Sequence, residues 1–162
     1  MKKLGVILFT FLFAGYGHAA SEGDKIYFGG GLGLNSVSGI DFGDGIGFQF
    51  FGGYELPVKI GKGSLSAEVG YMETGDMDWG VPGFFGFGEI NFKGVWANAV
   101  VNIPVQNNMN IVGRAGLDFG DDDGLMIGGG LSFQVSSKME IRAEYVIRDI
   151  VDSLQVNLVI RQ

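Results

Sequence analysis

The chain contains no cysteine, only three prolines and a single histidine among its 162 residues. Without cysteine it can form no disulfide, no zinc-thiolate site and no thiol nucleophile. Beyond the first twenty residues no run of 18 apolar residues occurs, so the sequence predicts no transmembrane helix. A net charge of −7 argues against a general affinity for nucleic acid, and no nucleic-acid partner is expected.

The N-terminus has the pattern of a secretory signal peptide. Lys2 and Lys3 precede an apolar stretch that runs to about Ala14, and the small residues Gly17 and Ala19 precede the expected cleavage site. The apolar stretch is short for a bilayer span, which leaves a retained anchor as the alternative. We therefore expect residues 1–19 to be removed and residues 20–162 to form one domain.

Cleavage would change the chemistry of the chain. It would remove His18, the only histidine, and two lysines, which takes the net charge from −7 to −9. The remaining domain would then have neither histidine nor cysteine to act as the base or nucleophile of a catalytic triad. Catalysis by carboxylates needs two acids that flank a cleft, and the sequence indicates no such cleft. We therefore predict that the chain is not an enzyme and has no cofactor.

What the sequence does contain is a regular alternation of apolar residues with small or polar ones. A period of two predicts strands with two different faces, and the 30 glycines disfavour helices. Alternation occurs in eight segments: 25–35, 45–56, 65–74, about 89–103, 111–119, 127–135, 141–148 and 154–161. Strands of about ten residues cross a bilayer when they are tilted by roughly 45°. The sequence therefore predicts an all-β fold, an eight-stranded antiparallel up-and-down transmembrane β-barrel.

The connections between these segments are of two kinds. Turns at Pro57, Pro104 and Ser136 alternate with short, glycine-rich connections, and proline suits a turn because it cannot donate to a strand ladder. The glycine-rich connections contain nine aspartates: Asp41, Asp44, Asp76, Asp78, Asp121, Asp122, Asp123, Asp149 and Asp152. With both termini in the periplasm, these acidic loops would face the outside of the cell.

The composition of the two faces indicates which one lies outside. The polar face is rich in Gly, Asn, Gln and Ser and poor in charge, whereas a water-facing exterior would carry more Lys and Glu. The apolar face has aromatic residues near the strand ends, where membrane barrels have aromatic girdles. We therefore expect the apolar face to contact lipid and the glycines to face a narrow lumen. A soluble, lipocalin-like periplasmic barrel that binds lipid is the alternative.

The last third of the chain carries a resemblance to a known family. The segments 128–133, 139–145 and 151–154 resemble the closing strands of the small outer-membrane β-barrel family, which includes the transmembrane domain of outer membrane protein A and outer membrane protein X. The resemblance implies export to a bacterial outer membrane and insertion by the barrel-assembly machinery. Members usually end on an aromatic residue, whereas this chain ends on Gln162, which weakens the insertion signal. Some small barrels of similar fold modify lipids, and they depend on a histidine with a serine. Residues 20–162 contain no histidine.

Four charged residues on the polar face form the first candidate site. Glu68, Arg114, Arg142 and Glu144 lie on strands that run in the same direction, so we expect their side chains to reach similar heights. The lumen of an eight-stranded barrel is narrow, and charges buried in it must pair. The sequence thus predicts a charge network that plugs the lumen, with the alternative that some of these residues face water-filled ends.

The second candidate site is the acidic triplet Asp121, Asp122 and Asp123. Its spacing does not match a calcium-binding loop, so a solvated hairpin tip is expected and no defined metal site. Weak contact with divalent cations or with lipopolysaccharide phosphates is the alternative. As a whole, the sequence indicates an outer-membrane barrel with a structural or surface-interaction role among lipid and lipopolysaccharide. It leaves the oligomeric state open, and a monomer is favoured. A narrow channel for small or apolar solutes is the second function left open.

Overall fold

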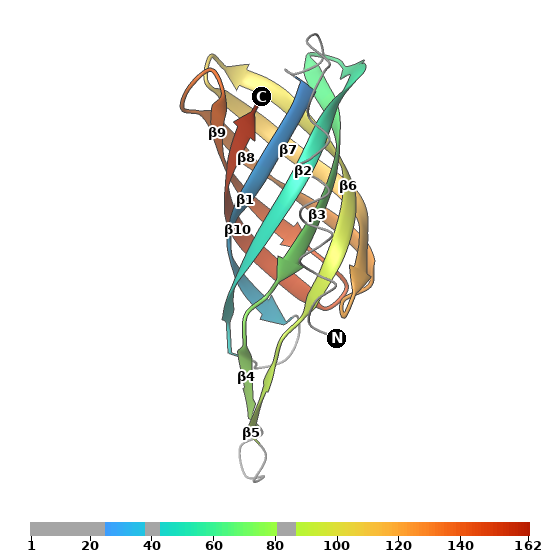
Figure 1. Ribbon diagram of the computed structural model, residues 1–162, viewed down its shortest axis with the longest axis vertical. Coiled ribbons are helices and arrows are strands. Elements are labelled where there is room, and N and C mark those ends of the chain that lie inside the picture. The colour runs from blue at the N-terminus through green and yellow to red at the C-terminus, as the bar shows by residue number, and fades with distance from the viewer. Residues whose placement is uncertain (1–24, 38–42, 81–86) are drawn as a thin grey trace.

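Eight strands close into an antiparallel barrel, as the sequence predicts (Figure 1). The computed structural model describes residues 25–37, 43–80 and 87–162, so the expected signal peptide and Asp41 lie outside the described residues. The barrel strands are β1 (Ile26–Val37), β2 (Gly45–Ile60), β3 (Gly63–Glu73), β6 (Lys93–Gln106), β7 (Met109–Gly120), β8 (Gly124–Gln134), β9 (Met139–Ile147) and β10 (Val151–Arg161). The first and last strands close the barrel, from the pair Tyr27 and Arg161 to the pair Val37 and Val151.

The two ends of the barrel carry different kinds of connection. One end, called the turn end below, holds the start of β1, the end of β10 and the tight connections at 61–62, 107–108 and 135–138. The opposite end, called the loop end, holds the connections 43–44, 74–92, 121–123 and 148–150 among the described residues. Exposed lysines lie at the turn end, at Lys59, Lys62 and Lys138. The ends of the barrel are therefore of opposite charge.

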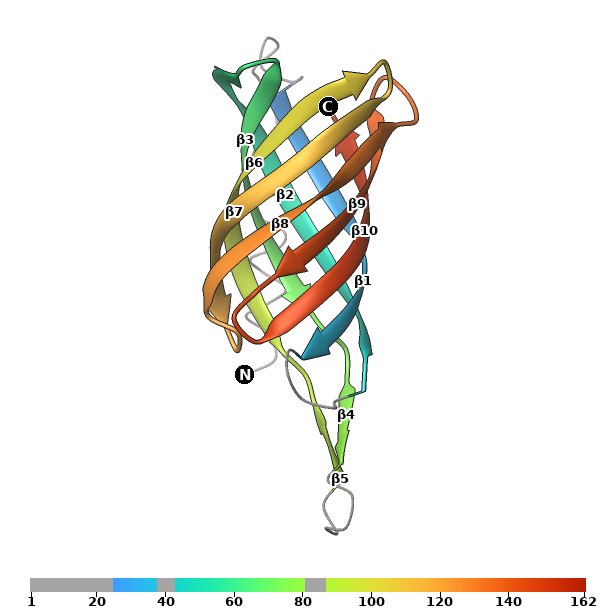
Figure 2. The same cartoon turned by 180° about the vertical axis from the view of Figure 1, so that it is seen from behind.

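The apolar face of every barrel strand points outward. On β10, for example, Leu154, Val156, Leu158 and Ile160 are each about half exposed, while the residues between them are buried. Figure 2 shows the steep tilt of β7, β8 and β9 across the far side of the barrel. Within the described residues, no helix has the length and apolar composition needed to span a bilayer. The predicted assignment of faces is confirmed.

One connection is longer and more structured than the short loop that the sequence predicts. Between β3 and β6 the chain forms a second, two-stranded sheet from β4 (Met77–Gly80) and β5 (Phe87–Ile90), which projects beyond the loop end (Figure 1). The strand expected at about 89–103 therefore begins later, at Lys93, because Glu89 belongs to this hairpin. The expected segment runs from the end of β5 into β6, so the sequence pattern does not reveal that the two strands belong to different sheets.

The sequence predicts that Pro57 and Pro104 open turns, but in the structure both lie inside strands. Pro57 lies inside β2 and Pro104 inside β6, and each coincides with a shift of register, between Glu55 and Lys59 and next to Gln106. Proline is tolerated there because a bulge leaves a backbone position without a ladder hydrogen bond. The turns themselves follow, with Gly61 at a positive φ of 62°.

Large apolar side chains as well as charged ones point into the lumen. A buried cluster lies inside the barrel and consists of Tyr27, Phe51, Met72, Trp96, Met126, Val146 and Val159. Glycines opposite these rings provide the room. A Cβ at Gly70 would lie 2.5 Å from the Trp96 ring, and one at Gly53 would collide with Tyr27. The sequence predicts inward glycines, but it assigns the space to charged residues, whereas much of it is taken by aromatic rings.

Candidate functional site

The four charged residues predicted to meet in the lumen are within ion-pair distance of one another. Arg114 on β7 binds Glu144 on β9 through two hydrogen bonds, of 2.9 Å from Nε to Oε1 and 2.7 Å from Nη2 to Oε2. Arg142 donates from Nη1 to Glu68 Oε1 at 2.7 Å, and Arg114 Nη2 lies 3.5 Å from Glu68 Oε2. All four side chains have no solvent exposure. We refer to these residues as the mid-lumen network.

The closed register explains why this network crosses the lumen. Glu68 on β3 is paired in the sheet with Gly53 and Asn98, so its carboxylate reaches Arg142 only through the barrel interior. Arg114 is opposite Gly128, whose missing side chain leaves room for it, since a Cβ there would lie 3.1 Å from Arg114 Cγ. The sequence places these residues on the inner face, and closure of the barrel brings them together.

Aromatic rings complete the mid-lumen network. The Tyr27 hydroxyl donates to Glu68 Oε1 at 2.8 Å, so this carboxylate has two donors. The guanidinium carbon of Arg114 lies 5.4 Å from the Trp96 ring centroid, and that of Arg142 lies 5.8 Å from the Phe51 centroid. Cations at this distance from a ring face are attracted by its quadrupole. The inward positions of these aromatic residues were visible in the alternation, but not their contact with arginine.

A second ion cluster, which the sequence analysis misses, lies at the turn end. Arg161 on β10 is 3.4 Å from Glu55 on β2 and 3.5 Å from Glu140 on β9, and its guanidinium carbon is 5.0 Å from the Tyr27 ring centroid. Glu140 in turn lies 3.5 Å from Arg142 of the mid-lumen network. The last strand is therefore connected by side chains to the first hairpin across the closing seam of the barrel.

A third cluster, also missed, crosses the lumen at the loop end. Arg148, in the connection between β9 and β10, donates from Nε to Asp118 Oδ2 at 2.9 Å and from Nη1 to Ser153 Oγ at 2.7 Å. Ser153 donates in turn to Asn35 Oδ1 at 2.6 Å. Arg148 thereby connects β7 with β10 and β1. The alternation that places Arg142 and Glu144 on the inner face also places Arg148 there, and the residue is 5% exposed, but the pattern does not show that it meets Asp118 and Ser153.

The acidic triplet does not act as one unit. Asp122 is buried, and its two carboxylate oxygens accept the backbone N–H groups of Ile150 at 2.8 Å and Val151 at 2.9 Å. The expectation of a solvated hairpin tip is therefore wrong for Asp122. Asp121 accepts the backbone N–H of Lys93 at 3.2 Å and remains exposed, as does Asp123. Within the described ranges no group of three or more metal-binding side chains gathers, and contact with cations or lipopolysaccharide stays a prediction for Asp121 and Asp123.

The loops at this end are joined to one another. Met77, Phe92 and Val151 form a buried apolar cluster at the loop end, with Val37 and Ile90 packed against it. The backbone N–H of Gly43 donates to the Asp78 carbonyl at 2.8 Å, which attaches the first loop to the β4–β5 hairpin. The exposed acidic residues on these loops are Asp44, Asp76, Asp78, Glu89, Asp121, Asp123 and Asp149.

A closed barrel of eight antiparallel strands with an apolar exterior and an ion-paired interior defines a class, the transmembrane β-barrels. The sequence profile of the outer membrane protein beta-barrel domain matches residues 5–160, and the chain belongs to this family. The resemblance identified in the last third of the sequence is confirmed, and the match extends it over nearly the whole chain. No curated protein sequence matches the chain.

Solved structures with the same fold include natural and designed barrels. The outer membrane protein Ail of Yersinia pestis in a phospholipid bilayer nanodisc is 16% identical, with a TM-score of 0.59, and the alignment covers 86% of this chain and 99% of Ail. Neisserial surface protein A is 12% identical, with a TM-score of 0.51 and coverage of 85% and 96%. A de novo designed transmembrane β-barrel is 14% identical, with a TM-score of 0.60 and coverage of 86% and 96%. At these identities the likeness concerns the fold.

Proposed function

We propose that this protein is an outer-membrane barrel with a structural and surface-interaction role, and that its lumen is plugged by its own side chains. The observation that carries the proposal is the contrast between the two parts of the molecule. The interior is occupied by three ion clusters and a buried apolar cluster, while the loop end presents acidic residues on connections that are fixed to one another. A packed interior suits a structural role, and a fixed arrangement of exposed loops suits contact with other molecules at the cell surface.

The charge of the loop end indicates the kind of partner. Seven acidic residues are exposed on the described loops, and Lys93 is the exposed basic residue among the described positions at that end. One structure of Ail holds the heparin analogue sucrose octasulfate, a polyanion. The exposed carboxylates of the present chain would repel such a ligand. We therefore propose a cationic partner, or divalent cations that join these carboxylates to lipopolysaccharide phosphates.

The plugged lumen separates this proposal from the channel alternative. A conducting pore would need a continuous hydrated path. The buried rings of Trp96 and Phe51, which lie beside the arginines of the mid-lumen network, support a lumen without such a path. The expected result in planar bilayers is therefore the absence of a steady conductance. A steady, ion-selective conductance of the unmodified protein would give preference to the channel. The proposal includes no catalytic role, because the sequence after residue 19 has neither histidine nor cysteine.

The absence of cysteine makes the display of the loops directly testable. Asp123→Cys at the loop end and Lys62→Cys at the turn end each introduce one thiol into a chain that has none. With a membrane-impermeant maleimide, the first variant should react on intact cells and the second only after permeabilisation. The reverse result would invert the topology. Equal reaction in a soluble periplasmic fraction would instead support the lipocalin-like barrel.

The sign of the partner is tested with two immobilised probes, oligolysine and heparin. Protein in nanodiscs should bind oligolysine in a salt-dependent manner and should not bind heparin. The triple variant Asp76→Asn, Asp78→Asn, Glu89→Gln should lose most of this binding. A matched control, Lys59→Gln with Lys62→Gln, changes charge at the turn end and should leave it intact. Binding to heparin in preference to oligolysine would overturn the proposed partner.

A further inference from the structure

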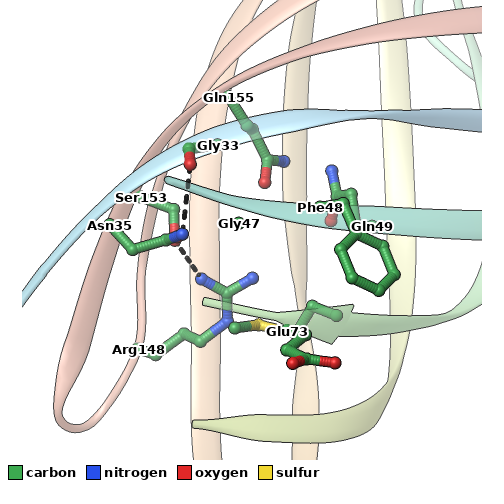
Figure 3. A pocket seen from close by; sticks show the side chains of 10 residues that line it. Gly33, Asn35, Gly47, Phe48, Gln49, Glu73, Arg148, Ser153 and Gln155 are labelled. Atoms are coloured by element: carbon green, nitrogen blue, oxygen red, sulfur yellow. Dashed lines mark hydrogen bonds between the residues drawn. The ribbon is translucent and has the colours of Figure 1, made fainter. Parts of the chain in front are cut away.

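A hollow lies in the lumen between Arg148 and the mid-lumen network. It has room for about one water molecule, a volume of about 10 Å³, and receives side chains from β1, β2, β3, β10 and the connection that carries Arg148. Gly33 and Gly47, which are paired across β1 and β2, form part of its wall. Figure 3 shows Gln49, Gln155 and Arg148 around this space, with Gly47 between them. Arg148, Ser153 and Asn35 of the loop-end cluster form one side of it.

Two buried amide atoms face this space without a partner. Within the described residues, Gln49 Oε1 and Gln155 Nε2 have no hydrogen-bond partner, although their side chains are 5% and 2% exposed. One of them is an acceptor and the other a donor. Buried polar groups in folded proteins are nearly always paired, with protein or with ordered water, because an unpaired group loses its hydration without compensation.

The hydrogen-bonding roles of these two atoms indicate which ligand the hollow can bind. A chloride ion could accept from Gln155 but would leave the Gln49 oxygen unpaired, and an ammonium ion would do the reverse. Water both donates and accepts, and a polar site with several partners is the kind of place where proteins hold it. The negative charge of Glu73 and the positive charge of Arg148, both at the wall, oppose each other and favour a neutral guest. We propose that this hollow is a binding site for resident water.

This water would connect two networks that are separate in their side-chain contacts. On one side, Arg148 belongs to the loop-end cluster. On the other side, Gln49 Nε2 donates to Asn157 Oδ1 at 2.8 Å, and Asn157 Nδ2 lies 3.5 Å from Glu144 Oε2 in the mid-lumen network. With water between them, hydrogen bonds extend from the loop-end cluster to the centre of the barrel. The site thus couples the position of the β9–β10 connection to the mid-lumen ion pairs.

A single methyl group tests the site. A Cβ on Gly33 would lie 3.4 Å from Asn35 Oδ1 and 3.6 Å from Gln155 Cβ, which are contacts that the side chains can accommodate. Gly33→Ala therefore occupies part of the hollow. Gly113→Ala is the matched control, because Gly113 lies on the outer face and a Cβ there meets nothing within 4 Å. Displacing a bonded water lowers stability, whereas filling a dry cavity raises it.

The measurements are urea unfolding in micelles and nuclear magnetic resonance of the full chain in nanodiscs. Gly33→Ala should lower the unfolding midpoint and shift the Arg148 Nε–H resonance, while Gly113→Ala should do neither. Gln155→Met should also lower the midpoint, since it removes a partner of the water; in a dry hollow the loss of an unpaired N–H would raise it. The Gln155 side-chain amide should show a cross-peak to water that Gly33→Ala abolishes. A raised midpoint in either lumen variant, or the absence of that cross-peak in the unmodified protein, would overturn the proposal.

Discussion

The Asp122 carboxylate accepts the backbone N–H of Val151 at 2.9 Å, and this contact joins two loops that are consecutive neighbours around the loop end of the barrel. The second oxygen of the same carboxylate accepts the N–H of Ile150 at 2.8 Å. Val151 in turn packs against Met77 and Phe92 at the base of the projecting hairpin. One buried aspartate thus fixes the connection between β9 and β10 and, through it, the arrangement of the acidic loops.

Replacing Asp122 should loosen that connection without opening the barrel. Asp122→Ala leaves two backbone N–H groups without their acceptor, and the buried one, of Val151, should cost about 1–3 kcal/mol. Amide hydrogen exchange at Ile150 and Val151 should accelerate, while exchange at the centre of β10 should stay slow. Asp123→Ala is the control, because Asp123 is exposed and belongs to the same loop. Equal acceleration in both variants would mean that loss of negative charge, and not the two hydrogen bonds, controls the loop.

The mid-lumen network should show coupling that follows its geometry. Removing one partner of a buried ion pair costs about 3–5 kcal/mol, because the other charge is left uncompensated. Arg114→Ala and Glu144→Ala should each lower the free energy of unfolding by this order, and the double variant should lose less than the two losses added together. The same cycle with Glu68→Ala should give a weaker coupling, since Arg114 lies 3.5 Å from Glu68 and 2.7 Å from Glu144. Urea unfolding in detergent micelles measures both cycles.

The sequence predicts on which face of a strand a charged residue lies, but not which residues it contacts. Alternation assigns Glu68 and Arg114 to the inner face, because the face on which a strand residue lies depends on its position along that strand and not on the neighbouring strands. It does not reveal that Arg161 meets Glu55 or that Arg148 meets Asp118, since those contacts depend on how the ends of the sheet register when the barrel closes. Asp122 was misjudged for the same reason, because its partners are backbone groups of another loop.

The turn-end cluster should contribute to closure of the seam between β1 and β10. Arg161 contacts Glu55 and Glu140 at 3.4 and 3.5 Å, and its side chain is 22% exposed, so the loss on Arg161→Ala should be modest, on the order of 1 kcal/mol. Lys59→Ala is the control, because Lys59 also contacts Glu55 but is largely exposed and makes no seam contact. Arg161→Ala should speed exchange at the Gln162 amide, which donates to the Ile26 carbonyl, and Lys59→Ala should not. Unchanged exchange in both variants would show that the backbone ladder alone holds the seam.

Residue 162 should influence how readily the barrel assembles. Alternation from Ile160 places the side chain of Gln162 on the outer face beside Ile26, whose partner in β2 is Tyr54. A phenylalanine there would extend the outer apolar surface at the turn end, where an aromatic girdle is expected. Gln162→Phe should therefore raise the yield of folded barrel and its rate of formation, read from the mobility of unboiled samples on gels during assembly. Gln162→Leu separates apolarity from aromaticity and should give an intermediate gain. If all three chains assemble at the same rate, the alternation of β10 is sufficient for assembly and the side chain at position 162 contributes nothing.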